Sequence, residues 1–232
     1  MAFILSLETA TPVCSVALHD KGALLAHFSL FLEKSHSAYL TEMVHDALRY
    51  ANRQLAELDA VALSEGPGSY TGLRIGASAA KGLCYALDIP VVTINTLAAH
   101  AYTVQAMGIA QPPQTGLLCP MLDARRMEVY SALYTHELKP VAPTSPVVVN
   151  EEAYHEYLNQ GLVYFFGNGA AKCKPVLSLH PNARFVDGIV PSAASVGQLA
   201  IEKVQAGTFA NLAYFEPFYL KEFKAIKPKQ QL

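Results

Sequence analysis

The 232-residue sequence contains no tryptophan and little charge. Only 16% of its residues are Asp, Glu, Lys or Arg, whereas soluble domains average about 25%. Because 52% of the residues are hydrophobic, the chain can bury a core, and this excludes a mainly disordered chain. The length fits one large domain or two small ones.

Positive charge is not in excess. The formal net charge is −2 and the pI is about 6.4, which argues against a chain that binds nucleic acid by itself. One segment departs from this pattern: the tail 221–232 is basic, with four lysines from Lys221 to Lys229 against one glutamate. Either this tail is simply solvated, or it contacts RNA or an acidic partner surface.

Metal, redox and membrane signals are missing as well. Cys14, Cys84, Cys119 and Cys173 form no CxxC pair and no zinc pattern, so reduced thiols are the simplest interpretation. No apolar run reaches the roughly 18 residues of a membrane-spanning helix. The N-terminal apolar run ends at Glu8 and lacks the positive charge of a signal peptide. We therefore expect a cytoplasmic protein without membrane contact.

Known catalytic motifs are absent. The glycines from Gly66 to Gly72 miss the GxGxxG spacing by one residue, and no GxxxxGK[ST] sequence occurs, which excludes a phosphate-binding P-loop. Tyr70 stands where a GxSxG hydrolase has its serine. The eight histidines are scattered and no HExxH sequence occurs, so no zinc-peptidase site is predicted.

The first half of the chain shows a clear order of strands and helices. Three apolar runs joined by tight turns predict an antiparallel meander. Apolar residues then recur at helical spacing from Leu40 to Leu55, and Ser35 or Ser37 is the candidate cap. The expected strands are 3–8, 14–19, 23–32, 60–63 and 91–94, and the expected helices are 40–51, 73–87 and one beginning near 96.

The second half repeats this β-β-β-α-β-α-β order. Its expected strands are 117–122, 127–134, 147–149, 162–166 and 184–186, and its expected helices are 151–159, 170–179 and 192–205. Two such units in tandem predict an α/β fold of two ribonuclease-H-like lobes, with mixed sheets flanked by helices. We place the lobes at 1–103 and 104–232, the second being the more divergent.

Two turns are candidates for contact with phosphate groups. The loop 66–76 follows a strand and begins a helix, so its amides lie at the positive end of a helix dipole; close helix–strand packing explains its glycines equally. The turn 8–11 is where sugar kinases and actin-like proteins meet ATP, usually through an aspartate and a glycine; here the acid is Glu8 and no glycine is present, so a plain hairpin is the favoured interpretation. The candidate cofactor-binding residues are Glu8, Thr9, Gly66 and Gly68.

Two helices of the first half are candidates for a subunit interface. One carries an aliphatic stripe and the next is rich in small residues, which suits helix packing between subunits; packing within the chain is the alternative. The candidate interface residues are Leu40, Met43, Val44, Ala47, Leu48, Gly72, Arg74, Ile75, Gly76 and Ala79. A third motif, Asp123-Ala-Arg125-Arg126, predicts either an Asp123–Arg125 ion pair in a turn or a contact between lobes or with a partner.

Six motifs together resemble those of the TsaB (YeaZ) family. They are Glu8-Thr-Ala-Thr11, Lys34-Ser-His-Ser37, the loop Gly66–Gly76, Asp123–Arg126 with Glu128-Val-Tyr130, Gly167-Asn-Gly169 and Pro217-Phe-Tyr-Leu220. They span nearly the whole chain in order. Glu8 departs from the aspartate with which the family usually opens.

The resemblance implies an ASKHA-type, actin-like fold and a non-catalytic role in the synthesis of tRNA N6-threonylcarbamoyladenosine. A TsaD-like paralogue then transfers the threonylcarbamoyl group, a TsaE-like ATPase joins the assembly, and tRNA is met only through the complex. The resemblance also implies a homodimer through the first-lobe helices when the chain is alone. No tightly bound cofactor is expected. Whether a nucleotide binds at a junction between subunits is left open by the resemblance.

The motif that holds the metal in TsaD-like enzymes is incomplete in this sequence. Their His-x-x-x-His pair corresponds to Thr96-Leu-Ala-Ala-His100, and the segment 191–195, where they have a later acidic ligand, has no carboxylate. A catalytic metal needs about three protein ligands, so we expect no metal site and no catalytic residue here.

Two enzymatic alternatives remain. A free-standing ASKHA kinase or ATP hydrolase needs an acid and a glycine turn that grips phosphate, and Glu8 supplies only the acid. A peptidase, the activity in the old glycoprotease label of this superfamily, is disfavoured by the lone His100 and by the missing hydrolase motifs.

Overall fold

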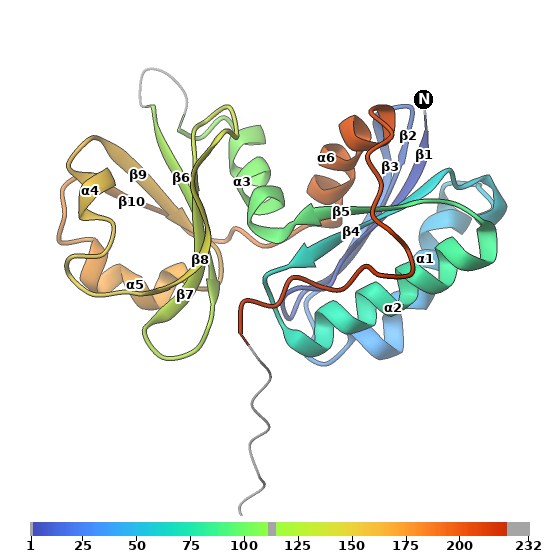
Figure 1. Cartoon of the computed structure of the whole chain (residues 1–232), viewed down its shortest axis with the longest axis horizontal. Helices are drawn as coiled ribbons and strands as arrows, with labels where there is room; N and C mark the ends of the chain where they lie inside the picture. The colour runs from blue at the N-terminus through green and yellow to red at the C-terminus, as the bar shows by residue number, and fades with distance from the viewer. Residues whose placement is uncertain (1, 111–114, 222–232) are drawn as a thin grey trace, which may run out of the picture.

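The computed structural model describes residues 2–110 and 115–221 and contains two five-stranded sheets (Figure 1). The first sheet has the order β3-β2-β1-β4-β5. Its strands are β1 (Phe3–Glu8), β2 (Cys14–Asp20), β3 (Ala23–Leu30), β4 (Ala60–Gly66) and β5 (Val91–Asn95). The first three strands are antiparallel, and β4 and β5 then run parallel to β1.

The second sheet has the same plan, with the order β10-β9-β6-β7-β8. Its strands are β6 (Gly116–Asp123), β7 (Glu128–Tyr134), β8 (Pro140–Val148), β9 (Leu162–Phe166) and β10 (Ala183–Val186). Here too three antiparallel strands are followed by two parallel ones. The predicted duplication is therefore confirmed, although β8 begins at Pro140, earlier than the expected 147, because the segment before residue 147 is also extended.

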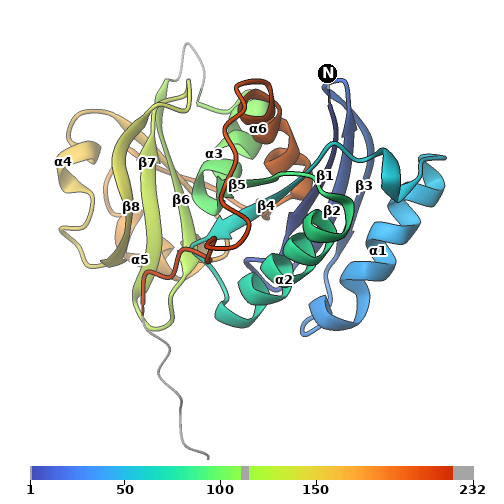
Figure 2. The same cartoon turned by 45° about the vertical axis from the view of Figure 1, so that its right-hand side comes forward.

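Helices cover both faces of each sheet (Figures 1 and 2). They are α1 (His36–Tyr50), α2 (Tyr70–Leu87), α3 (Thr96–Ala106), α4 (His155–Leu158), α5 (Ala170–Leu177) and α6 (Ala193–Gln205), with a short 3₁₀ helix at Leu55–Glu57. Strand side chains alternate between faces. Leu5 and Leu7 of β1 accordingly point to the core under α1 and α2, while Ile4 joins the core under α6.

The two halves exchange their closing helices. α3 ends the first half, but Leu97 and Val104 of this helix pack into a core of the second sheet. α6 ends the second half, but it packs on β1, β2 and β4 of the first sheet. The Ala193 amide at its start donates a hydrogen bond to Ser15 Oγ of β2 (3.1 Å). The sequence boundary at residue 103 falls inside α3 and stays a prediction.

Several predicted boundaries differ from the structure. α1 begins at His36 and α2 at Tyr70, each earlier than expected, because apolar spacing begins only where a helix meets the core. Ser35 is the N-cap residue of α1 but makes no side-chain capping bond. The helix expected at 151–159 is a single turn, α4. The segment 111–114 and most of the basic tail lie outside the described residues.

Candidate functional site

The glycine loop lies directly against the turn between β1 and β2. A Cβ atom at Gly72 would lie 2.1 Å from the Thr9 carbonyl oxygen, and one at Gly76 would lie 2.3 Å from Thr9 Oγ1. A Cβ atom at Gly68 would lie 2.5 Å from the Ala10 carbonyl oxygen. These glycines therefore let the start of α2 approach the turn more closely than any other residue type would allow.

Hydrogen bonds within the chain use the polar groups of this junction. The Ser69 amide donates to the Ala10 carbonyl (2.7 Å), and Ser69 Oγ accepts from the Gly72 amide as the cap of α2 (3.3 Å). The Ala10 amide donates to Glu8 Oε1 (2.6 Å), and Thr9 is buried. The candidate phosphate-binding residues Glu8, Thr9 and Gly68 thus lie together, but they are packed against other parts of the chain rather than lining an open phosphate-binding site.

The fourth candidate, Gly66, contacts the C-terminal segment instead. Its φ angle is +118°, and a Cβ atom there would lie 2.6 Å from the Phe218 carbonyl oxygen. The Phe218 amide in turn donates to the Glu65 carbonyl (2.7 Å). The segment after α6 therefore returns across the first lobe, and the Pro217–Leu220 motif packs on the end of β4.

Glu8 is fully buried at the end of β1. Burial raises the pKa of its carboxyl from 4.5 to about 7, although the hydrogen bond from the Ala10 amide acts in the opposite direction. A large share of this side chain is therefore protonated at neutral pH. A neutral acid without solvent access is poorly suited to bind a cation or to act as a catalytic base.

Thr96 and His100 lie one turn apart on α3, and both are completely buried. The His100 ring meets the Phe166 ring edge to face, with 5.8 Å between centroids. Burial lowers the pKa of His100 to about 4, and a backbone contact with Ile189 acts in the opposite direction. Among the described residues, no three His, Cys, Asp or Glu side chains gather in a way that could hold a metal ion.

The structure corrects the predicted interface. Six of the ten residues pack inside the chain: Leu40, Val44, Ala47 and Leu48 of α1, and Gly72 and Gly76 of α2. The aliphatic stripe of α1 is part of the core over the first sheet, so it leaves little surface for a partner. Met43, Ile75 and Ala79 are partly buried and pack at the edge of this core, where they keep some accessible surface, and Arg74 is exposed.

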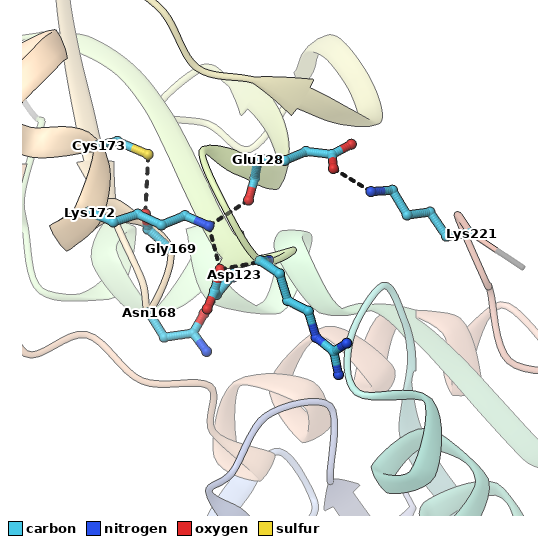
Figure 3. A network of polar contacts seen from close by, with 8 residues as sticks. Asp123, Glu128, Asn168, Gly169, Lys172, Cys173 and Lys221 are labelled. Carbon is cyan, nitrogen blue, oxygen red and sulfur yellow. Dashed lines mark hydrogen bonds and ion pairs between the residues drawn. The ribbon is translucent and has the colours of Figure 1, made fainter. Parts of the chain in front are cut away.

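A network of charged groups surrounds the turn between β6 and β7 (Figure 3). Lys172 of α5 forms an ion pair with Asp123 and also donates to the Glu128 carbonyl oxygen (2.6 Å). Glu128 forms a second ion pair with Lys221, at the end of the returning C-terminal segment. Burial alone would raise the pKa of Asp123, but the bonds from Lys172 and the Arg125 amide hold it below its usual value.

The predicted ion pair between Asp123 and Arg125 is wrong: Asp123 forms its ion pair with Lys172 instead. Asp123 Oδ1 accepts the backbone amide of Arg125 (2.9 Å), while the carboxylate pairs with Lys172. Asn168 holds the same residue from the other side, because its Oδ1 accepts the Asp123 amide (3.0 Å). Sequence reasoning gave no role to Lys172, since an ion pair across 49 positions leaves no local pattern; only the nearby Gly167-Asn-Gly169 motif pointed to this region.

The described helices include none that is both long and apolar enough to cross a membrane. Two surface features bear on function: the accessible side of α1 and α2, and the charged β6–β7 turn.

Comparison with known proteins yields relatives that agree with one another in family. Residues 31–222 match the family model described as TsaD: tRNA N6-adenosine threonylcarbamoyltransferase. The chain is 30% identical over 230 residues to the tRNA threonylcarbamoyladenosine biosynthesis protein TsaB of Escherichia coli K12, covering 97% of this chain and 96% of that protein.

Solved structures agree with the fold described above. YeaZ from Pseudomonas aeruginosa superposes with a TM-score of 0.81 at 26% identity, over 95% of this chain and 100% of that one. The activator of 2-hydroxyisocaproyl-CoA dehydratase from Clostridium difficile superposes with a TM-score of 0.52 at 8% identity, over 88% and 96% of the two chains, which shows a shared fold alone. The two-lobed ASKHA fold predicted from the sequence is thereby confirmed.

Proposed function

Because the chain belongs to the TsaB family of tRNA threonylcarbamoyladenosine biosynthesis proteins, we propose that it is the non-catalytic subunit that binds and activates a TsaD-like transferase. A TsaE-like ATPase completes this proposed assembly, and tRNA meets the chain only within it. The cytoplasmic location belongs to the same proposal, since the proposed substrate is tRNA.

Two observations carry the non-catalytic part of the proposal. At the turn where actin-like enzymes meet phosphate, the Ala10 amide is already donated to Glu8, and Gly72 brings α2 against the Thr9 carbonyl. At the position of the transferase metal pair, Thr96 and His100 are buried without a third ligand among the described residues. These residues fit neither a nucleotide phosphate nor a metal ion, so the chain is expected to act by docking.

The docking surface we propose is the outer side of α1 and α2. Its residues include Met43, Ile75 and Ala79, which are partly exposed, and Tyr39 and Tyr85, whose exposed fractions are 42% and 84%. Aromatic and aliphatic side chains beside a small residue suit close packing against a helix of a partner. The same surface serves the proposed homodimer when the chain is alone.

Reconstitution of tRNA modification tests the function directly. TsaD-like and TsaE-like partners are assayed for threonylcarbamoyladenosine with and without this chain, and product is expected to depend on its presence. Equal product without the chain would contradict the proposal. Substantial ATP turnover by the pure chain would favour a free-standing kinase or hydrolase instead.

The substitution Ala79→Arg tests the docking surface. It places a long charged side chain on a partly exposed helix position at the edge of the core, so we expect the affinity for the transferase partner to fall at least about tenfold, with a smaller loss of stability than a fully buried charge would cause. Pull-down and calorimetric titration measure the affinity. The matched control is Ala171→Arg, an exposed alanine of α5, which should bind like the original chain.

A second variant separates docking from folding. Val44→Arg inserts a charge into the core under α1, so it should lower the unfolding temperature much more than Ala79→Arg does. If Ala79→Arg and Ala171→Arg bind the partner equally well, the interface lies elsewhere on the molecule.

A further inference from the structure

Two of the six arginines in the chain differ from the other four. Arg49, Arg53, Arg74 and Arg184 each donate a side-chain hydrogen bond within the protein. Arg125 and Arg126, at the tip of the β6–β7 turn, are exposed, and their guanidinium groups make no hydrogen bond or ion pair among the described residues. The tip therefore presents two adjacent cations to its surroundings.

The backbone of this tip is strained. Arg125 and Arg126 have φ angles of 69° and 50°, in the left-handed region that non-glycine residues seldom occupy. Such strain persists only where neighbouring structure imposes it, and it is often found at functional positions. Neither position carries the glycine or asparagine that would relieve it.

The turn is held firmly from three sides. Asp123 Oδ1 fixes the Arg125 amide, the Glu128 amide donates to the Arg125 carbonyl (3.2 Å), and Lys172 ties both strands to α5. The network in Figure 3 thus anchors the base of the turn. Two guanidinium groups on a fixed base lose less entropy on binding than they would on a mobile loop.

The charges of this region do not cancel. Asp123 is paired with Lys172, and Glu128 is paired with Lys221. The two carboxylates are therefore balanced by the two lysines, and the two arginines leave the turn with a net charge of +2. This stands out in a chain whose net charge is −2.

We propose that Arg125 and Arg126 contact the phosphate backbone of the tRNA substrate, an inference that rests on the proposed function. Guanidinium groups in fixed positions suit phosphate oxygens, which position an RNA without reading its sequence. A protein partner would favour an apolar centre around the charges, but the tip itself offers only the exposed Met127 and the small, half-buried Ala124 beside the arginines.

Binding of tRNA to the assembled complex tests this inference. The double variant Arg125→Gln/Arg126→Gln keeps non-glycine side chains at both strained positions and removes only the charges. We expect its affinity for tRNA, measured by fluorescence anisotropy, to fall about tenfold, and the slope of log K against log salt to lose about 1 to 2 in magnitude. The matched control is Arg184→Gln, which removes an exposed arginine of β10 and should change neither quantity.

The outcomes separate this inference from the proposed function. A complex that assembles normally and binds tRNA with unchanged affinity and salt slope would overturn the role of the arginines and leave the subunit function intact. If the chain joins no transferase, the proposed function fails, and the inference that rests on it fails with it. A double variant that loses assembly while keeping RNA binding would identify an acidic protein surface as the occupant.

Discussion

Replacing Gly72 with alanine is expected to destabilise the folded chain by about 3 kcal/mol or more. The added Cβ atom would lie 2.1 Å from the carbonyl oxygen of Thr9, far inside van der Waals contact. The obstructing atom belongs to the backbone of the β1–β2 turn, so no side-chain rotation can relieve the clash. α2 would have to move away from the first sheet, which would open the core beneath it.

Gly82 supplies the matched control on the same helix. A Cβ atom there would meet nothing within 4 Å, so Gly82→Ala should stabilise the chain by up to about 1 kcal/mol through higher helix propensity. Urea unfolding followed by circular dichroism measures both variants. Equal stability of the two variants would show that the glycine loop does not need its close contact with the turn.

The substitution Glu8→Gln is expected to remove a pH-dependent loss of stability of about 3 kcal/mol. The folded-state pKa of about 7 lies above the ordinary value of 4.5, because burial opposes ionisation. Below pH 4.5 the carboxyl is largely protonated in both the folded and the unfolded state, so it does not lower the free energy of unfolding. As the pH rises to 7, the unfolded chain ionises while the folded chain resists, so folding stability falls through this window and stays low above it.

Glutamine mimics the protonated acid and keeps the acceptor for the Ala10 amide. The variant should therefore match the original chain near pH 4.5 and exceed its stability at pH 8. Taking the difference between the two proteins at each pH cancels the titration of all other groups, including the buried His19 and His100. A constant difference from pH 4.5 to pH 8 would mean that Glu8 ionises as freely in the folded state as in the unfolded one.

The order of strands and helices could be read from the sequence because it depends on local periodicity. Alternating and continuous apolar runs gave the strands of both lobes, and helical spacing gave the positions where α1 and α2 meet the core. The glycines of the loop were also informative locally, since Gly68, Gly72 and Gly76 cluster within one helix start. Sequence alone left open whether they bind phosphate or allow packing, and the contacts with Thr9 and Ala10 favour packing.

Other properties arose only when distant segments met. The stripe from Leu40 to Leu48 has the same spacing whether it faces a sheet or a partner, and only the first sheet packed beneath α1 determined that it is core. Asp123 pairs with Lys172 rather than with its near neighbour Arg125 because α5 of the second lobe lies beside the turn. The sequence by itself determined the duplicated fold, because hydrophobic periodicity is a local property of the chain. Burial of Glu8, exposure of the arginine tip and exchange of the closing helices were decided by tertiary structure, because solvent access and charge pairing depend on which segments meet.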